Sequence, residues 1–354
     1  MKYIVGITFL SLITLSSQVF GQASSCAQTL RLVQSTYEQG RLHELESLMA
    51  GCLKSGFDTP QKVSAYKYLT LAYIYLEEPE KADAAMLELL NADNFFKPND
   101  AVDPAEFIAL YRKFRVDPLF RFGLKGGLTY TMPAISEIFY VGGSASGYGK
   151  YTPKFNVSAA LVFEKDFFGF IKKFSIAPEI GYTVRSYIYS NPQLTYKDEN
   201  PDNPNFILEE NLQKQAWLDL NLLGQYKIME SKFNPYIGIG PGISYLLNSS
   251  TEIQTVVIDR NTITGSAIDT KSSYNSLAYS VIIAVGAKIR TGAFYLTGNI
   301  RYQYGLNNVV NESTRSNSEA LFDRAFIPSN YRHNNVTFNF GLVIPYFKPK
   351  KLIK

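Results

Sequence analysis

The sequence has few of the residues from which catalytic and metal sites are most often built. Its 354 residues include two histidines, His43 and His333, and two cysteines, Cys26 and Cys52. No zinc-ligand spacing is present, so the sequence predicts no metal site and no cofactor. The chain also lacks a large excess of charge of one sign. Its net charge of +4 is too small to argue for nucleic-acid binding.

Long hydrophobic runs are missing as well. The apolar run Ile4 to Leu15, which follows Lys2, is too short to span a membrane as a helix, and no later run reaches that length. With Val19-Phe20-Gly21 before a cut near Gln22, residues 1–21 are predicted to be a secretory signal peptide. The exported protein is therefore either soluble or a membrane barrel.

Aromatic residues, by contrast, are abundant. They make up 14% of the chain, with 25 Tyr and 24 Phe, while the mean hydropathy is only -0.09. A chain rich in tyrosine but weakly hydropathic is typical of a membrane barrel, because only one face of each strand meets lipid.

The two cysteines are predicted to form a disulfide, because an isolated pair in an oxidising periplasm favours one. The alternative is that Cys26 is a lipidated cysteine. The preceding Ala23-Ser24-Ser25 lacks the large aliphatic residue that lipoprotein signals usually carry, which favours the disulfide.

Residues 22–117 have a helical period, with apolar residues three and four positions apart. Gly40 reads as the turn between two helices, so that Cys26 opens the first and Cys52 closes the second, and an antiparallel pair brings those ends together. Thr59 is a candidate N-cap with Pro60 at the first helical position, and two further helices are expected to begin near Pro79 and Pro104.

Part of this helical region resembles tetratricopeptide repeats. The resemblance rests on Tyr68, Leu71, Ala72 and Tyr75, with Gly40 in the first turn. It covers about two repeats, whereas a stable array usually needs three or more, so a plain helical bundle is an equal alternative. The resemblance implies a domain that docks another protein.

From Pro118 onwards the apolar period changes to two, and eight segments alternate apolar and polar residues. Short connections at 166–172, 230–233 and 291–292 alternate with long polar ones. This layout is typical of outer-membrane barrels, whereas the loop lengths of a soluble sandwich would scatter. The eight expected strands lie within 120–130, 155–163, 174–184, 218–228, 237–245, 277–289, 294–304 and 336–346, and the long connections are 132–153, 190–213, 248–275 and 305–334.

The predicted fold is therefore α plus membrane β. A TPR-like helical bundle at 22–117 precedes an eight-stranded antiparallel transmembrane β-barrel at 118–347, and a basic tail at 348–354 is expected to be solvated or to touch lipid head groups. With an even strand count both barrel ends lie in the periplasm, so the helical domain is expected there and the barrel in the bacterial outer membrane.

Charged residues on the inward face of the strands form a candidate site in the barrel lumen. An ion path is the alternative to a salt-bridged plug, which is favoured because eight strands leave little lumen and buried charges must be paired. The predicted cluster comprises Arg121, Lys125, Glu179, Arg185, Asp219, Lys227, Lys288 and Arg301.

Enzymatic alternatives have weak support, and the chain is predicted not to be an enzyme. Ser329, His333 and Asp323 lie near each other in sequence and could form a hydrolytic set at the barrel rim, but no motif fixes them. A loop with Asp198, Glu199 and Asp202 could hold Ca²⁺ but lacks the spacing of a calcium loop.

The Gly-rich strand Pro235-Tyr236-Ile237-Gly238-Ile239-Gly240-Pro241-Gly242 resembles the outer-membrane β-barrel proteins of Bacteroidota, the PorT-like group, as does the signal ending Gly21-Gln22. The basic extension after Phe347 departs from the usual terminal aromatic. The first functional hypothesis is a barrel that anchors a periplasmic docking domain within an envelope, secretion or motility assembly. Its partners would be outer-membrane lipid and a periplasmic or outer-membrane protein. The alternatives are a surface-binding protein acting through four long extracellular loops and a small channel.

Overall fold

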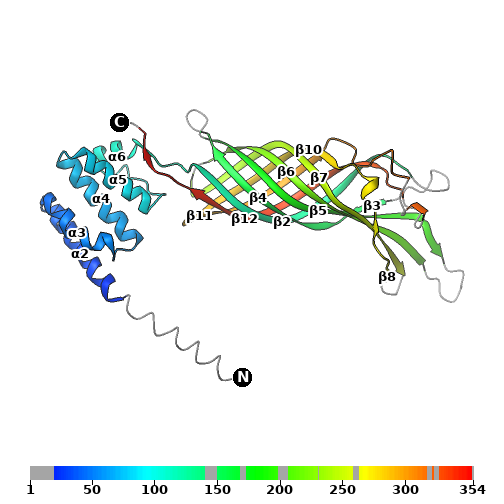
Figure 1. Cartoon of the computed structure of the whole chain (residues 1–354), viewed down its shortest axis with the longest axis horizontal. Coiled ribbons are helices and arrows are strands. Elements are labelled where there is room, and N and C mark those ends of the chain that lie inside the picture. The colour runs from blue at the N-terminus through cyan, green and yellow to red at the C-terminus, as the bar shows by residue number, and fades with distance from the viewer. Residues whose placement is uncertain are drawn as a thin grey trace, which may run out of the picture. The chain divides into compact units, whose positions relative to one another are not determined.

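The computed structural model describes residues 20–139, 150–167, 173–197, 206–229, 231–257, 263–316, 321–322 and 327–352 (Figure 1). The chain divides into two compact units. One unit joins Met1–Pro118 with Phe347–Lys354, and the other is Leu119–Tyr346. The predicted signal peptide lies almost wholly outside the described residues. Within the described ranges, no helix combines the length and apolar character that a membrane crossing requires.

The first unit, here called the helical unit, is built from consecutive helices whose starts follow local sequence signals. Asp58 caps α4, because its carboxylate accepts a hydrogen bond from the Gln61 backbone N–H at 2.8 Å and the Gln61 side chain accepts one from the Asp58 N–H at 3.1 Å. Thr59 was therefore the wrong N-cap, by one residue. The helices are α2 (Phe20–Glu38), α3 (Leu45–Lys54), α4 (Thr59–Tyr75), α5 (Pro79–Ala92) and α6 (Ala105–Tyr111).

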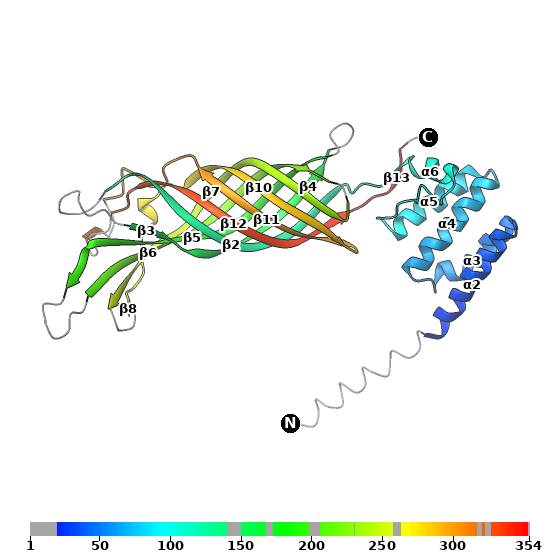
Figure 2. The same ribbon diagram turned by 180° about the vertical axis from the view of Figure 1, so that it is seen from behind.

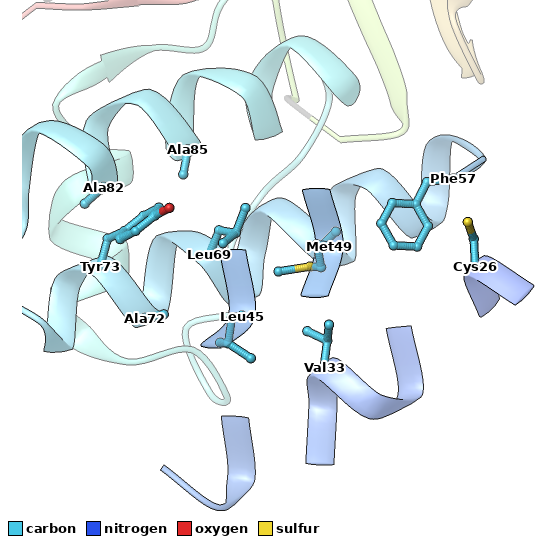
Figure 3. Packing of buried hydrophobic residues seen from close by; sticks show 11 residues of the cluster. Cys26, Val33, Leu45, Met49, Phe57, Leu69, Ala72, Tyr73, Ala82 and Ala85 are labelled. Carbon is cyan, nitrogen blue, oxygen red and sulfur yellow. The ribbon is translucent and has the colours of Figure 1, made fainter. Parts of the chain in front are cut away.

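The core of the helical unit is shared by its first helices (Figure 3). Val33 of α2 packs with Leu45 and Met49 of α3, and all three side chains are fully buried. The predicted disulfide between Cys26 and Cys52 is confirmed, with 5.7 Å between the two Cα atoms. The bond joins α2 to α3, in agreement with the expectation that an antiparallel helix pair brings Cys26 and Cys52 together.

The chain's C-terminal tail belongs to this unit too. Strand β1 (Phe114–Arg115) pairs antiparallel with β13 (Lys350–Lys351), and Lys351 forms an ion pair with Asp83 of α5. The expectation of a solvated tail is therefore wrong for Lys351, which is only partly exposed and ion-paired, whereas Lys350 and Leu352 are exposed. A short basic run reads as solvated in a sequence because nothing in it reveals an acidic partner far away along the chain.

The second unit is an antiparallel sheet of long strands. In sheet order they are β10, β11, β12, β2, β4, β5, β6 and β7, and β7 pairs in turn with β10. Each of these eight strands thus has a hydrogen-bonded neighbour on both sides, and they run side by side at an oblique tilt (Figure 2). Their bounds are β2 (Phe120–Glu137), β4 (Phe155–Asp166), β5 (Phe174–Lys197), β6 (Phe206–Lys227), β7 (Phe233–Val257), β10 (Leu277–Thr291), β11 (Phe294–Gly305) and β12 (Asn330–Tyr346).

Every expected strand coincides with one of these long strands, although the expected strand at 218–228 runs one residue past the end of β6, and three of the strands continue well beyond expectation. Strands β5, β6 and β7 have 24, 22 and 25 residues and enter the stretches expected to be loops at 190–213 and 248–275. The short strands β3 (Lys150–Pro153), β8 (Ile263–Thr264) and β9 (Ile268–Asp269) pair along this extension. The connections on this side are therefore partly folded as sheet.

The outward face of the strands is apolar and exposed. Phe122, Leu124 and Leu128 on β2 are each at least half exposed. Aromatic rings border this band, since Phe120 stacks on Tyr346 at 4.9 Å and Tyr130 lies 4.8 Å from Phe155 at the other end. The span from Phe120 to Tyr130 matches the length of roughly 9–11 residues that a tilted strand needs to cross a bilayer.

Candidate functional site: the charged lumen

The inward face of the sheet holds buried ion pairs arranged in three groups along the strands. The first group lies near the short connections, at the start of β2 and the ends of β4, β6 and β10. Arg121 donates to Asp166 at 2.8 and 2.5 Å and to Glu164 at 3.1 Å. Lys288 donates to Glu164 at 2.6 Å, and Lys227 donates to Asp166 at 2.7 Å. Each carboxylate is thereby shared between two cations from different strands.

The second group centres on Glu179 of β5, whose side chain is fully buried. Lys125 of β2 donates to it at 2.9 Å, and Arg301 of β11 donates through two nitrogens at 2.5 and 2.8 Å. The Arg301 Nε–H donates to Asn299 at 2.9 Å. This group ties β2, β5 and β11 together across the lumen, since these strands are not neighbours in the sheet.

The third group lies toward the long connections. Asp219 of β6 accepts hydrogen bonds from Arg185 and Thr183 at 2.6 Å each, and from Ser244 at 2.5 Å. The Arg185 guanidinium also lies over the Trp217 ring at 5.1 Å from its centroid. A buried arginine thus has both a counter-ion and an aromatic face, as charge burial requires.

A buried aromatic cluster lies beyond the third group. The Tyr187 hydroxyl donates to the Tyr331 hydroxyl at 3.0 Å, and Trp217 packs edge-on to His333 at 5.4 Å between ring centroids. Tyr274 is buried beside them, together with Val309 and Val310 from the connection between β11 and β12. These residues cover the inward face at the end that faces the long connections.

Two small cavities lie among these side chains of the described strands. A cavity of about 40 Å³ lies between the second and third groups, lined by Arg301, Asp219 and Asn339 among others. Another of about 10 Å³ adjoins Arg185 and His333. Because a water molecule needs on the order of 10–15 Å³ by this measure, these cavities fit a few waters at most. The geometry is that of a filled interior.

The structure gives the burial of the eight residues predicted to line the lumen. Seven of them are buried, and Lys227 is half-buried at the end of β6. Two inward carboxylates were missed, Glu164 and Asp166. Strand alternation could have found Glu164, because its neighbours Phe163 and Lys165 point the other way; Asp166 was assigned to the turn, although β4 includes it.

The described contacts of Ser329 and His333 do not form the hydrogen-bonded pair that the hydrolytic alternative needs. The His333 Nδ1 atom lies 3.5 Å from Arg185 Nη1, and the Ser329 hydroxyl accepts a hydrogen bond from the Phe139 N–H at 3.2 Å. In these contacts His333 and Ser329 bind different partners. Asp323 and the candidate calcium residues Asp198, Glu199 and Asp202 lie outside the described residues.

Metal chemistry has no candidate site either in the part of the chain that the structure describes. There, no three His, Cys, Asp or Glu side chains gather closely enough to hold a metal ion.

No curated protein matches the chain. Among solved structures it is similar to OprG of Pseudomonas aeruginosa, with 14% identity and a TM-score of 0.35 over 66% of this chain and 98% of that one. Neisserial surface protein A gives 10% identity and a TM-score of 0.32 over 64% and 97%. Ail of Yersinia pestis gives 9% and 0.27 over 64% and 99%.

The family comparison is the decisive one. The model of the outer membrane protein beta-barrel domain matches residues 114–311, which is more than half of the 354 residues and includes most of the strands. On that match, and with strands that alternate an apolar outer face with a charged inner one, the chain belongs to the outer membrane protein beta-barrel domain family.

Proposed function

We propose that this protein is a non-enzymatic outer-membrane anchor. An eight-stranded transmembrane barrel, closed and sealed, holds a periplasmic helical domain that docks another protein of the envelope. The observation that carries the proposal is the lumen, in which Glu164, Asp166, Glu179 and Asp219 are all engaged by cations from other strands. A barrel whose interior is filled in this way has its function outside the lumen.

Transport is disfavoured by the energetics of these pairs. Opening a path would separate buried ions whose hydrogen bonds replace water, and leaving one of them unpaired costs on the order of 3–5 kcal/mol. Eight strands also leave little interior once side chains are in place. The energetics and the strand number together support an anchor over a channel.

The division of the chain supports a single location for both chain ends. The segments before β2 and after β12 belong to the same compact unit. A membrane barrel delivers both ends to one face only if the number of crossings is even, as it is with eight strands. Because the N-terminal disulfide needs an oxidising compartment, we propose that this face is periplasmic.

The helical unit supports a docking role through its exposed apolar side chains. Leu32 of α2 and Tyr75 of α4 are 50% and 51% exposed, although both lie on helices that supply the core. The rings of Tyr37 of α2 and Tyr68 of α4 pack against each other, with 5.3 Å between their centroids. The proposed resemblances, to tetratricopeptide repeats in this unit and to PorT-like Bacteroidota barrels in the other, fit a docking domain on an envelope machine.

The test is cross-linking in intact cells followed by purification of the tagged protein and identification of what remains attached. Three versions are compared: the full chain, a variant lacking residues 22–117, and a variant lacking only residues 198–205 between β5 and β6. Heat-modifiable migration on gels checks that each barrel has assembled. We expect one partner to be retained by the full chain and the 198–205 variant, and lost from the 22–117 variant.

A second candidate function, surface binding, is favoured by one observation. Strands β5, β6 and β7 continue past the exposed Tyr182 and Tyr245 and carry β3, β8 and β9 with them. A folded extension on the outer side can present a surface to an external ligand. A partner lost with the 198–205 variant and kept by the 22–117 variant would select this function over docking.

A further inference from the structure

The C-terminal tail contacts the helical unit in the way an added strand contacts a receptor. Phe114 pairs with Lys351 and Arg115 with Lys350, and the ladder is antiparallel. The Leu352 N–H donates to the Lys113 carbonyl at 2.8 Å. The Arg115 guanidinium donates to the Lys348 carbonyl at 2.6 Å. These bonds use the backbone of the tail and so depend on its extended conformation.

Side chains add selectivity to this backbone pairing. Lys351 forms its ion pair with Asp83 of α5, and both side chains are only partly exposed. Phe347 packs edge-on to Phe95, with 5.0 Å between ring centroids. An aromatic residue and a basic residue four positions apart are therefore each matched by a partner on the helical unit.

The receiving strand is fixed independently of the tail. Phe114 of β1 is buried in a cluster with Leu71, Met86, Leu89 and other residues of the helices. A two-residue ladder has no stability of its own, so the tail is held by what the helices already present. Such strand addition takes its affinity from main-chain bonds and its specificity from side chains.

We propose that the helical unit carries a binding site for an extended basic peptide, formed by β1, Asp83 and Phe95, and that the chain's own tail occupies it in cis. The covalent link keeps the tail at a high effective concentration, so even a weak site is filled. The tail would occupy it whether or not the helical unit also docks a second protein.

The test uses the full mature chain in detergent, with and without residues 348–354. The probe is a fluorescent synthetic peptide of residues 347–354, and binding is followed by anisotropy. We expect saturable binding to the truncated chain and at least about tenfold weaker binding to the intact chain, whose site is filled. Equal binding to both, or none to the truncated chain, would overturn the proposal.

Charge reversal then tests the register. In the truncated chain, Asp83→Lys is expected to weaken peptide binding about three- to tenfold, and a peptide carrying Lys351→Asp is expected to regain it. A loss that the reversed peptide does not restore would contradict the proposed pairing. Glu88→Lys, on the same helix, is the matched control for a general change of charge.

A second measurement covers the case in which truncation unfolds the helical unit. In the intact chain, Asp83→Lys and Lys351→Asp are made singly and together, and amide hydrogen exchange is followed at residues 113–115 and 350–352. Each single variant should speed exchange there, and the double variant should restore protection. Exchange unchanged by either single variant would show that the ion pair does not hold the tail.

Discussion

The carboxylate of Glu179 is the counter-ion of two buried cations. Lys125 and Arg301 both donate to it, and its side chain is shielded from solvent. Its neighbours would therefore be left as uncompensated charges if it were neutralised. Buried pairs are weak contributors to stability when intact, but breaking one by removing a single partner is costly.

We accordingly expect Glu179→Gln to destabilise the barrel by about 3–5 kcal/mol. Urea unfolding in lipid vesicles, followed by heat-modifiable gel migration, measures the change. The matched control is Lys214→Ala, which breaks the more exposed pair of Lys214 with Glu252 and should cost no more than about 1 kcal/mol. Equal effects of the two variants would contradict a dry, ion-paired interior.

Tyr111 is expected to make the stability of the helical unit depend on pH in the alkaline range. Its hydroxyl donates to the Phe96 carbonyl at 3.0 Å, and burial, followed by the charges of Asp117 and Asp93, raises its pKa to about 12. An unfolded tyrosine titrates near 10, so the protonated folded form is favoured and its contribution is complete below pH 10. That contribution is lost as the pH rises from 10 to 12.

The variant Tyr111→Phe should lose about 1 kcal/mol at neutral pH with its hydrogen bond, and should then fall less steeply than the wild type between pH 10 and 12. Thermal unfolding followed by the helical circular dichroism signal measures both effects. Parallel decline of the two proteins over that range would show that other tyrosines set the alkaline limit.

For single residues, the sequence predicts which face of a strand a side chain lies on better than it predicts the ion pair that the side chain forms. Strand alternation alone assigned Arg121, Lys125 and Arg301 to the inside, where the structure has them. It could not reveal that Glu164 receives Lys288 from β10, because pairing across a lumen depends on how the sheet curves. Long-range ion pairs between strands that are not neighbours have no local sequence signal.

At the scale of strands, close packing of backbones sets a limit on side-chain size. A Cβ atom added to Gly240 of β7 would come within 1.8 Å of the Leu222 carbonyl oxygen on the neighbouring β6, where only a shift of backbone could relieve it. At Gly126 of β2 the nearest atom would be 3.9 Å away. The two glycines therefore differ in what they tolerate.

Gly240→Ala should destabilise the barrel by about 1–3 kcal/mol through overpacking and lower the folded fraction, whereas Gly126→Ala should leave both nearly unchanged. Refolding yield into detergent, scored by gel migration, distinguishes the two. A normal yield from Gly240→Ala would mean that β6 and β7 can separate slightly without loss of pairing.

Strand positions were predictable and strand ends were not. Within the apolar band, lipid on one side enforces alternation that can be read directly. Beyond it, β6 carries polar residues on both faces: Gln213 and Gln215 are buried and Lys214 between them is exposed, so the apolar signal disappears. The sequence therefore predicts loops where β5, β6 and β7 continue as strands.

For the whole molecule, the filled lumen leads to an electrical prediction. The purified protein in planar bilayers should give no resolved conductance steps over a range of voltages, because buried ion pairs and the aromatic cluster occupy the inward face of the described strands. An eight-stranded barrel known to be open would serve as the positive control. Stable single-channel steps would revive the channel alternative and remove the main support for an anchor.

The placement of the disulfide has a consequence for the order of events during export. Both cysteines lie within the first 52 residues, and the remaining 302 residues contain none. With the helical unit in the proposed periplasmic location, the bond can form while most of the chain is still on the other side of the inner membrane. With a single possible pairing there is nothing to reshuffle, so a simple thiol oxidant suffices and a disulfide isomerase has no task in maturing this protein.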